Sequence, residues 1–428
     1  MFRSICLQYF VLFGCITPVL VAGNPSPNTI VATIGGFDGP QGIAITPDGT
    51  LAYIVNFDAN NVSIVNIATN EIIDTISGFS SPAYIAITPD GTRAYVSNQN
   101  GTTVSVITIP GNTVTSIAGF SGPRGIAITP DGTHVYVANT LANNVKVIQT
   151  SNNTISATIT IAGSGLPYGV AITPNGAYAY VTDAASNSVY VIDTATNTHV
   201  TTTGLVGNFN QPQVIAITPD GTHAYVVNSN SNTVSVINTT TNMVVNTISG
   251  FNQPVDIAIT PNGRYAYVAN LAGNSVSVIS IATNTVIPTP GLNSDFDGPR
   301  GIAITPNGLY VYVSSEDSTF VTVIFAGLNV GAPTNVQIRK IKNKFFTQTD
   351  LINYITWQVP ATGGIINAPV SYQIYRDAGL TQLVATVLAT SPLQYYDHNR
   401  QPNTTYTYYI VSVDQLGDTS LVASATIA

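Results

Sequence analysis

The sequence predicts an all-β protein in which a seven-bladed β-propeller with four-stranded blades precedes a smaller β-sandwich. Seven copies of one motif carry the first part of this prediction: an apolar triplet, Thr-Pro, Asp or Asn, Gly, and then a tyrosine-containing strand. The copies recur every 41 to 45 residues, a period typical of propeller blades. Beyond residue 326 the repeat ends and the composition changes. The prolines that mark the motif are Pro47, Pro89, Pro130, Pro174, Pro219, Pro261 and Pro306.

The motif explains the first hairpin of each blade, and the copy from Ile85 to Asn98 is typical. Proline sets φ at the first central position of a turn, Asp or Asn bonds the nearby backbone, and glycine takes the positive φ. Two further strand-like runs follow in each unit, as in Thr233–Ile237 and Met243–Ile248. Four short strands make one blade. We interpret the turn carboxylates, such as Asp90, as turn formers rather than calcium ligands, because they occur one per blade.

The first strand-like segment, Asn28–Ile34, resembles the last strand of a blade although no blade has yet begun. Blade seven lacks its fourth strand, because after Phe320–Ile324 the chain leaves the repeat without an outer strand. We therefore expect Asn28–Ile34 to complete blade seven and close the ring. Closure removes an unpaired sheet edge, which otherwise invites aggregation. The predicted propeller spans residues 28–326.

The second strand of each blade carries a tetrad that resembles the repeat of the YVTN family of seven-bladed β-propellers. The resemblance covers roughly residues 28–325 and implies that the apolar triplets form the innermost strands. It leaves enzyme classes open, since related propellers include lactone hydrolases and the haem-binding domain of nitrite reductases. Because the tetrad tyrosine recurs at one structural position, we interpret it as core between blades. Five tetrads begin at Tyr53, Tyr95, Tyr136, Tyr225 and Tyr267, and the tetrads of blades four and seven end in Asp183 and Ser315.

Residues 327–332 are a predicted linker, and residues 333–428 a predicted domain of the size of an immunoglobulin-like sandwich. The segment around Tyr406 resembles the tyrosine-corner strand of fibronectin type III domains. We interpret Tyr406 and Trp357 as core residues. The basic run Arg339–Lys344 is interpreted as a strand whose lysines prevent edge pairing, with contact to anionic lipid or polysaccharide as the alternative.

Residues 1–23 have the pattern of a secretory signal peptide, with Arg3 ahead of an apolar run that ends in small residues. A short linker, residues 24–27, follows. A single-span anchor is a competing interpretation, although the run is shorter than the roughly 20 apolar residues that a span prefers. A third interpretation is peripheral anchoring through a lipid, because Leu12–Cys15 resembles a lipobox in which Cys15 would be lipidated. The expected location is secreted, periplasmic or cell-surface.

The charge of the propeller excludes one class of partner. Only 7% of all residues are charged, and residues 28–330 contain five basic and fifteen acidic side chains. A surface of this sign repels nucleic acid, so we expect no nucleic-acid partner. The four histidines lie at no metal-ligand spacing, and the sequence predicts no metal site, no cofactor and no catalytic residue.

The repeats differ most just before the innermost strands, where two positions per blade vary while the strands around them agree. Variation on a rigid scaffold is where binding residues are usually found. These positions are expected to ring one mouth of the central channel, which makes them the predicted ligand site. The candidate residues are Gln41, Tyr84, Arg124, Tyr168, Gln213, Asp256 and Arg300.

Two of these candidates, Arg124 and Arg300, belong to blades three and seven, which lie across the ring from one another. One interpretation is that the pair grips a carboxylate or a sulfated sugar, because a guanidinium offers planar, bidentate donors. The other is that each arginine pairs with a nearby acid such as Asp256, Asp295 or Asp297.

The predicted function is that of an exported, non-catalytic binding or surface protein. The channel mouth would recognise a protein, a glycan or a small anion at the cell surface, and the sandwich would act as a spacer or second contact. A propeller enzyme of lactonase-like or cofactor-binding type is the first alternative, and a structural component of a surface coat is the second. The sequence predicts no oligomeric state.

Overall fold

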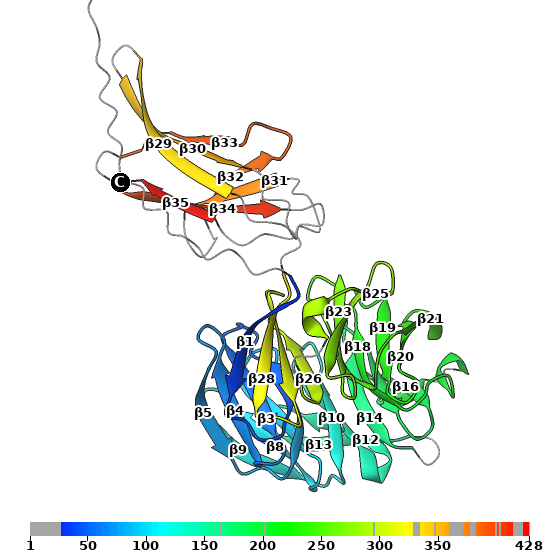
Figure 1. Ribbon diagram of the computed structural model, residues 1–428. Helices are drawn as coiled ribbons and strands as arrows, with labels where there is room; N and C mark the ends of the chain where they lie inside the picture. The colour runs from blue at the N-terminus through cyan, green and yellow to red at the C-terminus, as the bar shows by residue number, and fades with distance from the viewer. Residues whose placement is uncertain are drawn as a thin grey trace, which may run out of the picture.

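The structure is a computed structural model of the 428-residue chain (Figure 1). It describes residues 27–161, 165–200, 203–293, 296–327, 334–345, 348–358, 371–376, 382–398, 400–401, 404–413 and 423–427. The predicted signal peptide, the lipobox at Cys15 and most of both predicted linkers lie outside these residues. Within them, no helix has both the length and the apolar character needed to cross a membrane.

Residues 29–325 form seven antiparallel sheets of four strands each. The first sheet contains β2 (Pro40–Ile45), β3 (Leu51–Asn56), β4 (Asn61–Asn66) and β5 (Glu71–Ser77). The second contains β6 (Pro82–Ile87), β7 (Arg93–Asn98), β8 (Thr103–Thr108) and β9 (Thr113–Ala118). The third contains β10 (Pro123–Ile128), β11 (His134–Asn139), β12 (Asn144–Gln149) and β13 (Thr154–Thr160). The fourth sheet contains β14 (Pro167–Ile172), β15 (Tyr178–Asp183), β16 (Ser188–Asp193) and β17 (Thr198–Val200). The fifth contains β18 (Pro212–Ile217), β19 (His223–Asn228), β20 (Thr233–Asn238) and β21 (Met243–Ser249). The sixth contains β22 (Pro254–Ile259), β23 (Tyr265–Asn270), β24 (Ser275–Ser280) and β25 (Thr285–Ile287). The seventh is β26 (Pro299–Ile304), β27 (Tyr310–Ser315), β28 (Phe320–Phe325) and β1 (Thr29–Gly35). In the described connections lie three 3-10 helices, η1 (Thr140–Ala142), η2 (Thr203–Leu205) and η3 (Pro290–Leu292).

The seven sheets are the blades of a propeller (Figure 1). The first strand of each blade contacts the first strand of the next, from β2 and β6 through to β22 and β26, and β26 contacts β2. The apolar triplets therefore lie on the innermost strands. In blade seven the fourth place is taken by β1, which runs antiparallel to β28 with Thr29 opposite Phe325 and Gly35 opposite Phe320.

The turn after each innermost strand repeats one hydrogen-bond pattern. In blade two, Thr88 Oγ1 donates to Asp90 Oδ1 at 2.6 Å, and the Thr92 amide donates to the same oxygen at 3.0 Å. These bonds, the Thr88 bond foremost, lower the pKa of the Asp90 carboxyl. Gly91 has φ +70°, a value that glycine adopts without strain. The turn carboxylate therefore accepts hydrogen bonds from residues of its own turn, which agrees with its interpretation as a turn former.

The tetrad tyrosines connect neighbouring blades. Tyr225 is 1% exposed, and its hydroxyl donates to Asn284 Oδ1 in the next blade. Asn284 has φ +52° and stands at the turn before the outer strand, a conformation that asparagine tolerates. We call these contacts the tyrosine latches, and the prediction that the tyrosines are core residues is confirmed. The latches are Tyr53–Asn112, Tyr95–Asn153, Tyr136–Asn197, Tyr180–Asn242, Tyr225–Asn284, Tyr267–Asn28 and Tyr312–Asn70.

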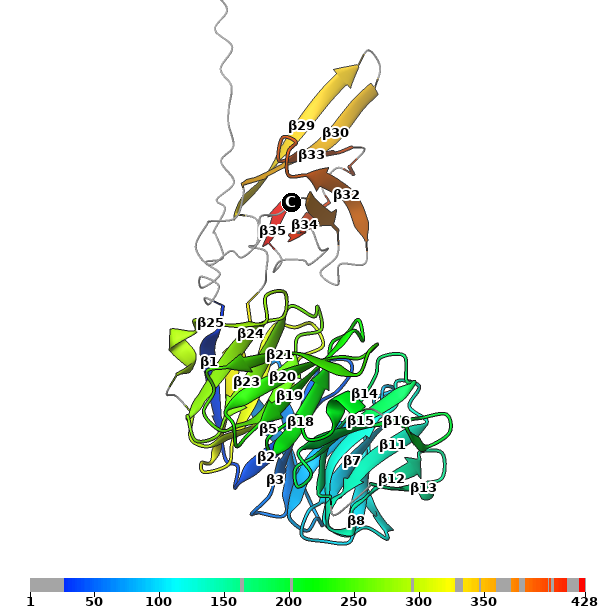
Figure 2. The same ribbon diagram turned by 90° about the vertical axis from the view of Figure 1, so that its right-hand side faces the viewer.

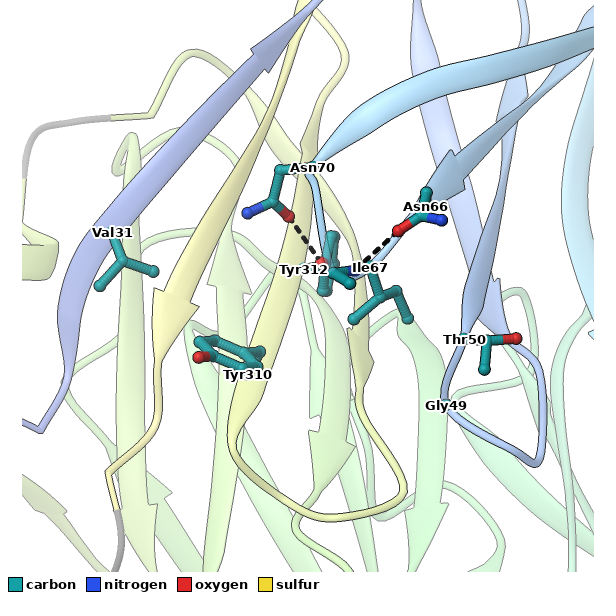
Figure 3. Close-up of a pocket in the computed structure, with 9 residues that line it drawn as sticks. Val31, Gly49, Thr50, Asn66, Ile67, Asn70, Tyr310 and Tyr312 are labelled. Carbon is teal, nitrogen blue, oxygen red and sulfur yellow. Dashed lines mark hydrogen bonds between the residues drawn. The ribbon is translucent and has the colours of Figure 1, made fainter. Parts of the chain in front are cut away.

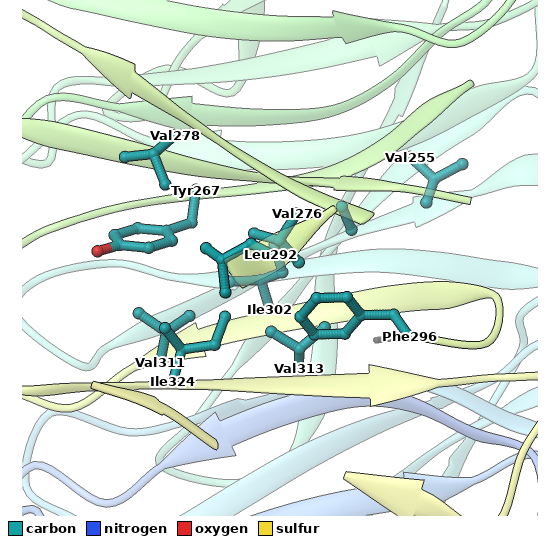
Figure 4. Packing of buried hydrophobic residues seen from close by; sticks show 11 residues of the cluster. Val255, Tyr267, Val276, Val278, Leu292, Phe296, Ile302, Val311, Val313 and Ile324 are labelled. Carbon is teal, nitrogen blue, oxygen red and sulfur yellow. The ribbon is translucent and has the colours of Figure 1, made fainter. Parts of the chain in front are cut away.

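Apolar side chains fill the space between blades, as Figure 4 shows for blades six and seven. Val278 on β24 faces Val311 and Ile302 of the next blade, and Leu292 of η3 lies between them with no exposed surface. Burying a side chain of this size stabilises a fold by about 1.5–3 kcal/mol. Each blade therefore depends on its neighbours for much of its stability.

The described residues of the C-terminal unit form two antiparallel sheets (Figure 2). One has the order β29-β30-β33 and the other β32-β31-β34-β35. The strands are β29 (Thr334–Phe345), β30 (Gln348–Gln358), β31 (Ser371–Tyr375), β32 (Leu383–Leu388), β33 (Gln394–Asp397), β34 (Tyr406–Val413) and β35 (Ala423–Ile427). Their core contains Trp357, Tyr372 and Tyr408, which confirms the interpretation of Trp357. Tyr406 is half-buried against this cluster, and its hydroxyl accepts a 3.0 Å bond from the Gln401 amide.

A buried carboxylate anchors the same unit. Asp397 Oδ1 accepts a 2.6 Å bond from Arg376, and Arg400 lies 3.3 Å from Asp397 Oδ2. Tyr408 donates to the same carboxylate from the core. Of the basic run, Arg339 is exposed and its guanidinium lies 4.6 Å from the ring centre of Tyr354.

Candidate functional site

Each innermost strand begins with a proline followed by two residues near which the strand pairing is irregular. In blade one the pairing with β3 passes from Pro40 directly to Ile43, so Gln41 and Gly42 bulge from the sheet. Bulges of this kind re-aim side chains. Gly42 is required here, because a Cβ on it would lie only 2.6 Å from the carbonyl oxygen of Ala83 in the next blade.

Most blades place one large side chain at this bulge. In blades one, three, four and seven the second residue is glycine, and the first is Gln41, Arg124, Tyr168 or Arg300. In blades two and six the first residue is small or apolar, and the second is Tyr84 or Asp256. Blade five carries Gln213 followed by Val214, which packs into the core between blades five and six.

These side chains meet on the axis of the ring. A cavity of about 10 Å³, room for about one water molecule, is lined by Gln41, Tyr84, Gln213, Asp256 and Arg300. Because these residues come from blades on different sides of the ring, the cavity lies in the channel. Arg124 and Tyr168 join the group through direct contacts. All seven predicted residues are therefore gathered at one mouth, where their side chains nearly fill the channel.

One half of the mouth is an ion-pair network. Arg300 Nη1 donates to Glu316 Oε2 at 2.6 Å, and Gln41 Nε2 donates to Glu316 Oε1 at 2.7 Å. Burial alone would lower the pKa of Arg300, but Tyr168, Tyr84 and Glu316 together raise it, so the guanidinium stays charged. Arg300 thus pairs with an acid, but with Glu316 rather than with Asp256 or Asp297; Asp295 lies outside the described residues.

The other half is built around Tyr168. The guanidinium of Arg124 lies 4.5 Å from the centre of the Tyr168 ring, within range of a cation–π interaction. Tyr84 meets the same ring edge-on at 6.2 Å, and Arg300 Nη2 lies 3.5 Å from the Tyr168 hydroxyl. Arg124 and Arg300 belong to blades on opposite sides of the propeller, and both therefore contact one tyrosine. Among the described carboxylates, none forms an ion pair with Arg124.

Asp256 differs from the other acids of the propeller. Its Oδ1 accepts a 2.8 Å bond from the Ile257 amide, and its Oδ2 accepts a 2.8 Å bond from Ile302 in blade seven. Burial nevertheless raises the pKa of Asp256 to about 7, although these two hydrogen bonds and the positive charge of Arg300 lower it. Burial, with the neighbouring Tyr168, also raises the pKa of Tyr84. Nowhere in the described ranges do three His, Cys, Asp or Glu side chains gather as metal ligands.

Glu316 is the member of the ion-pair network that the sequence analysis missed. It directly follows the tetrad of blade seven, at the end of β27. The equivalent residues of the other blades are also diverse, so a comparison of this position across the repeats would have indicated it. These residues are Phe57, Gln99, Thr140, Ala184, Ser229, Leu271 and Glu316.

A larger cavity of about 500 Å³ lies elsewhere, between blades seven and one (Figure 3). Val31, Ile67 and Tyr310 line it, with Asn70 of a tyrosine latch at its edge. Gly49 and Thr50 place it at the far end of β2 from the mouth. No charged side chain lines it, so the candidate recognition site is the smaller cavity, where the charges gather.

Comparison with known proteins agrees with this architecture. The family described as "Lactonase, 7-bladed beta-propeller" matches residues 28–162, 116–243 and 170–343. The chain belongs to this family. A chain of Kuenenia stuttgartiensis hydrazine synthase is similar in structure, with a TM-score of 0.62 and 23% identity over 68% of this chain and 97% of that chain. A likeness at this identity shows the fold alone. A search of curated proteins found no match.

Proposed function

We propose that the protein is an exported, non-catalytic binding protein whose channel mouth recognises an anionic group on a small molecule, a glycan or a protein. The observation that carries this proposal is Arg124, which has no ion-pair partner among the described carboxylates and stacks on Tyr168. A guanidinium fixed on an aromatic ring keeps its donors available for a carboxylate or sulfate. Arg300 already bonds Glu316, so it would act as a supporting cation.

Thermal and denaturant unfolding with a panel of anions tests the proposal. The panel contains acidic sugars, sulfated sugars, short dicarboxylates and acidic peptides, with neutral sugars for comparison. A ligand present at about 100 times its Kd should stabilise the fold by about 2.7 kcal/mol. Arg124→Gln should abolish the stabilisation, and Arg300→Gln should reduce it.

Lys146→Gln is the matched control, because Lys146 also lies over an aromatic ring, Phe120 at 5.9 Å, but on the third strand of blade three. This variant should respond to the ligand like the wild type. Equal stabilisation of the wild type and Arg124→Gln would contradict the proposal, as would the absence of any response across the panel.

A lactone hydrolase is the second candidate, and family membership favours it. Asp256 has a pKa raised to about 7, which suits a general base at neutral pH. In such a reaction Asp256 would take a proton from water, and the water oxygen would attack the lactone carbonyl. The ring C–O bond would then break, and the leaving alkoxide would take the proton from Asp256 to give a hydroxy acid. Both Asp256 oxygens already accept backbone bonds, which favours the binding function. Release of acid from a lactone panel, lost in Asp256→Asn, would establish the enzyme instead.

The proposal extends to the architecture. We assign the repeats to the YVTN type on the tetrads, and ring closure to β1 on its pairing with β28 and the Tyr267–Asn28 latch. The two-sheet C-terminal unit is proposed to be a fibronectin type III-like spacer, supported by the bond between Tyr406 and the backbone five residues upstream. Export through residues 1–23 remains part of the proposal, with lipidation at Cys15 as its alternative.

A further inference from the structure

The larger cavity lies at the seam of the ring, where blades seven and one meet (Figure 3). Val31 of β1 and Tyr310 of β27 lie on one side of it, and Ile67 and Asn70 come from the turn between β4 and β5. Its volume of about 500 Å³ falls within the range of small-molecule sites, roughly 300–1,000 Å³. The same positions recur between the other blades, so a comparison shows what differs at the seam.

Between blades one and two, a carboxylate occupies the corresponding space. Asn112 is the latch asparagine there, and its Nδ2 donates to Asp74 Oδ2 at 2.7 Å. Asp74 follows the bulge in β5, the outer strand of blade one. Ala32 stands at the same place in β1, the outer strand of blade seven. Because a methyl group accepts no hydrogen bond, β1 offers no side-chain acceptor at this position.

Asn70 is the latch asparagine at the seam. Its Oδ1 accepts a 2.8 Å bond from the Tyr312 hydroxyl, and among the described residues none accepts a bond from its Nδ2. In Figure 3 this nitrogen points away from Tyr312, toward the side of the cavity where Val31 lies. A side-chain amide has two N–H donors, so the wall of the cavity presents donors to a ligand.

Tyr310 lines the cavity without filling it. Arg93 has the equivalent place in blade two, at the start of the second strand, and its guanidinium donates to the Thr150 carbonyl in blade three. That contact bridges the space between blades two and three. Tyr310 is half-buried and packs instead on Phe325 of its own blade, with the ring centres 5.8 Å apart. The seam therefore lacks both the carboxylate and the bridging side chain found between other blades.

We propose that this cavity binds a neutral sugar residue. None of its nine lining residues is charged, so an ionic ligand would lose its hydration without gaining an opposite charge. A sugar ring has a C–H face, which suits Val31 and the ring of Tyr310, and hydroxyl groups that accept from the Asn70 amide. Because the ligand would contact β1, blade seven and blade one together, binding would also strengthen the closure of the ring.

Titration of the full chain with a panel of neutral sugars tests the site, followed by saturation-transfer NMR and by the unfolding temperature. The panel contains hexoses, N-acetylhexosamines and the methyl glycoside of each, because a free sugar and the end of a glycan present the same ring. At least one member should bind and raise the unfolding temperature with increasing concentration. Arg124→Gln should respond like the wild type, so this site and the channel mouth are tested separately.

Ala32→Asp is the decisive variant, because it gives β1 the acceptor that β5 has. The carboxylate should accept from Asn70 Nδ2 and weaken sugar binding by about tenfold, the value of one good hydrogen bond. Thr33→Asp is the matched control, since it adds the same charge at the next, exposed residue and should bind like the wild type. If Ala32→Asp does not fold, Tyr310→Ala replaces it, because it removes the ring on which the sugar would rest.

Two results would overturn the proposal. One is that no sugar of the panel binds to the wild type. The other is equal sugar binding by the wild type, Ala32→Asp and Tyr310→Ala, which would place the sugar elsewhere on the protein. Neither result depends on the response to anions, which is tested through Arg124.

Discussion

The contribution of β1 to the propeller can be measured at a single side chain, Ile34. Ile34 is 7% exposed and packs in the cluster between blades seven and one, together with Phe37, Ile54 and Val323. The neighbouring Thr33 points outward and is exposed. If β1 is a full member of blade seven, Ile34→Ala should behave like a core substitution, although the residue lies near the start of the described chain.

The expected magnitude follows from the buried volume. Isoleucine to alanine at a buried site costs about 2–5 kcal/mol, a large part of the roughly 5–15 kcal/mol by which domains are stable. Ile248 occupies the same place in β21 of blade five, 5% exposed and opposite Val234 as Ile34 is opposite Val321. Ile34→Ala and Ile248→Ala should therefore agree within about 1 kcal/mol.

The assay is urea unfolding of the purified full chain, followed by far-ultraviolet circular dichroism. Thr33→Ala should stay within about 0.5 kcal/mol of the wild type, as surface substitutions usually do. If β1 frays from the sheet, as chain ends often do, Ile34→Ala will match Thr33→Ala instead of Ile248→Ala. That result would refute ring closure by the N-terminal strand.

Three further predictions concern other parts of the chain. Tyr225→Phe removes one tyrosine latch and should lower the free energy of unfolding by about 1 kcal/mol, measured by urea unfolding; no change would show that the latch adds nothing. The pKa of Asp256 is raised to about 7 in the folded state from about 3.9 unfolded, so the folded state holds the proton longer and stability should fall as pH rises from about 4 to 7. Asp256→Asn should flatten this slope, and an unchanged slope would assign it to other groups. Asp397→Asn removes the buried partner of Arg376 and should destabilise the C-terminal unit by about 1–3 kcal/mol, since the arginine itself is partly exposed. The fluorescence of the single tryptophan, Trp357, reports on that unit alone, and a midpoint equal to that of the wild type would contradict the prediction.

The propeller could be predicted from the sequence because its determinants are local and repeated. Thr-Pro-Asp-Gly fixes a turn through bonds within six residues, as Thr88 and Asp90 illustrate, and the period of the turns counts the blades. The core role of the tyrosines followed from their constancy. Their latch partners did not, because the asparagines are distant in the sequence: Asn284 stands 59 residues after Tyr225, and Asn28 stands 239 residues before Tyr267.

The candidate site was predictable as a set of positions but not as a network. Repeat comparison identified the bulge residues, yet which side chains meet across the ring depends on channel width and on side-chain length. Arg300 reaches both Glu316 and the hydroxyl of Tyr168 in blade four, and neither contact has a sequence signature.

The bulge at the start of each innermost strand gives the channel mouth a modular design. Its two residues stand ahead of the regular pairing with the second strand. In blade one the glycine of the pair approaches the backbone of the next blade closely, and the Gln41 carbonyl accepts a bond from Ser314 of blade seven. The dipeptides Gln41-Gly42 and Arg124-Gly125 could therefore be exchanged between blades while the apolar triplets and tyrosine latches stay constant. A small library of such dipeptides would vary ligand preference independently of folding, which is how one scaffold can serve many recognition tasks.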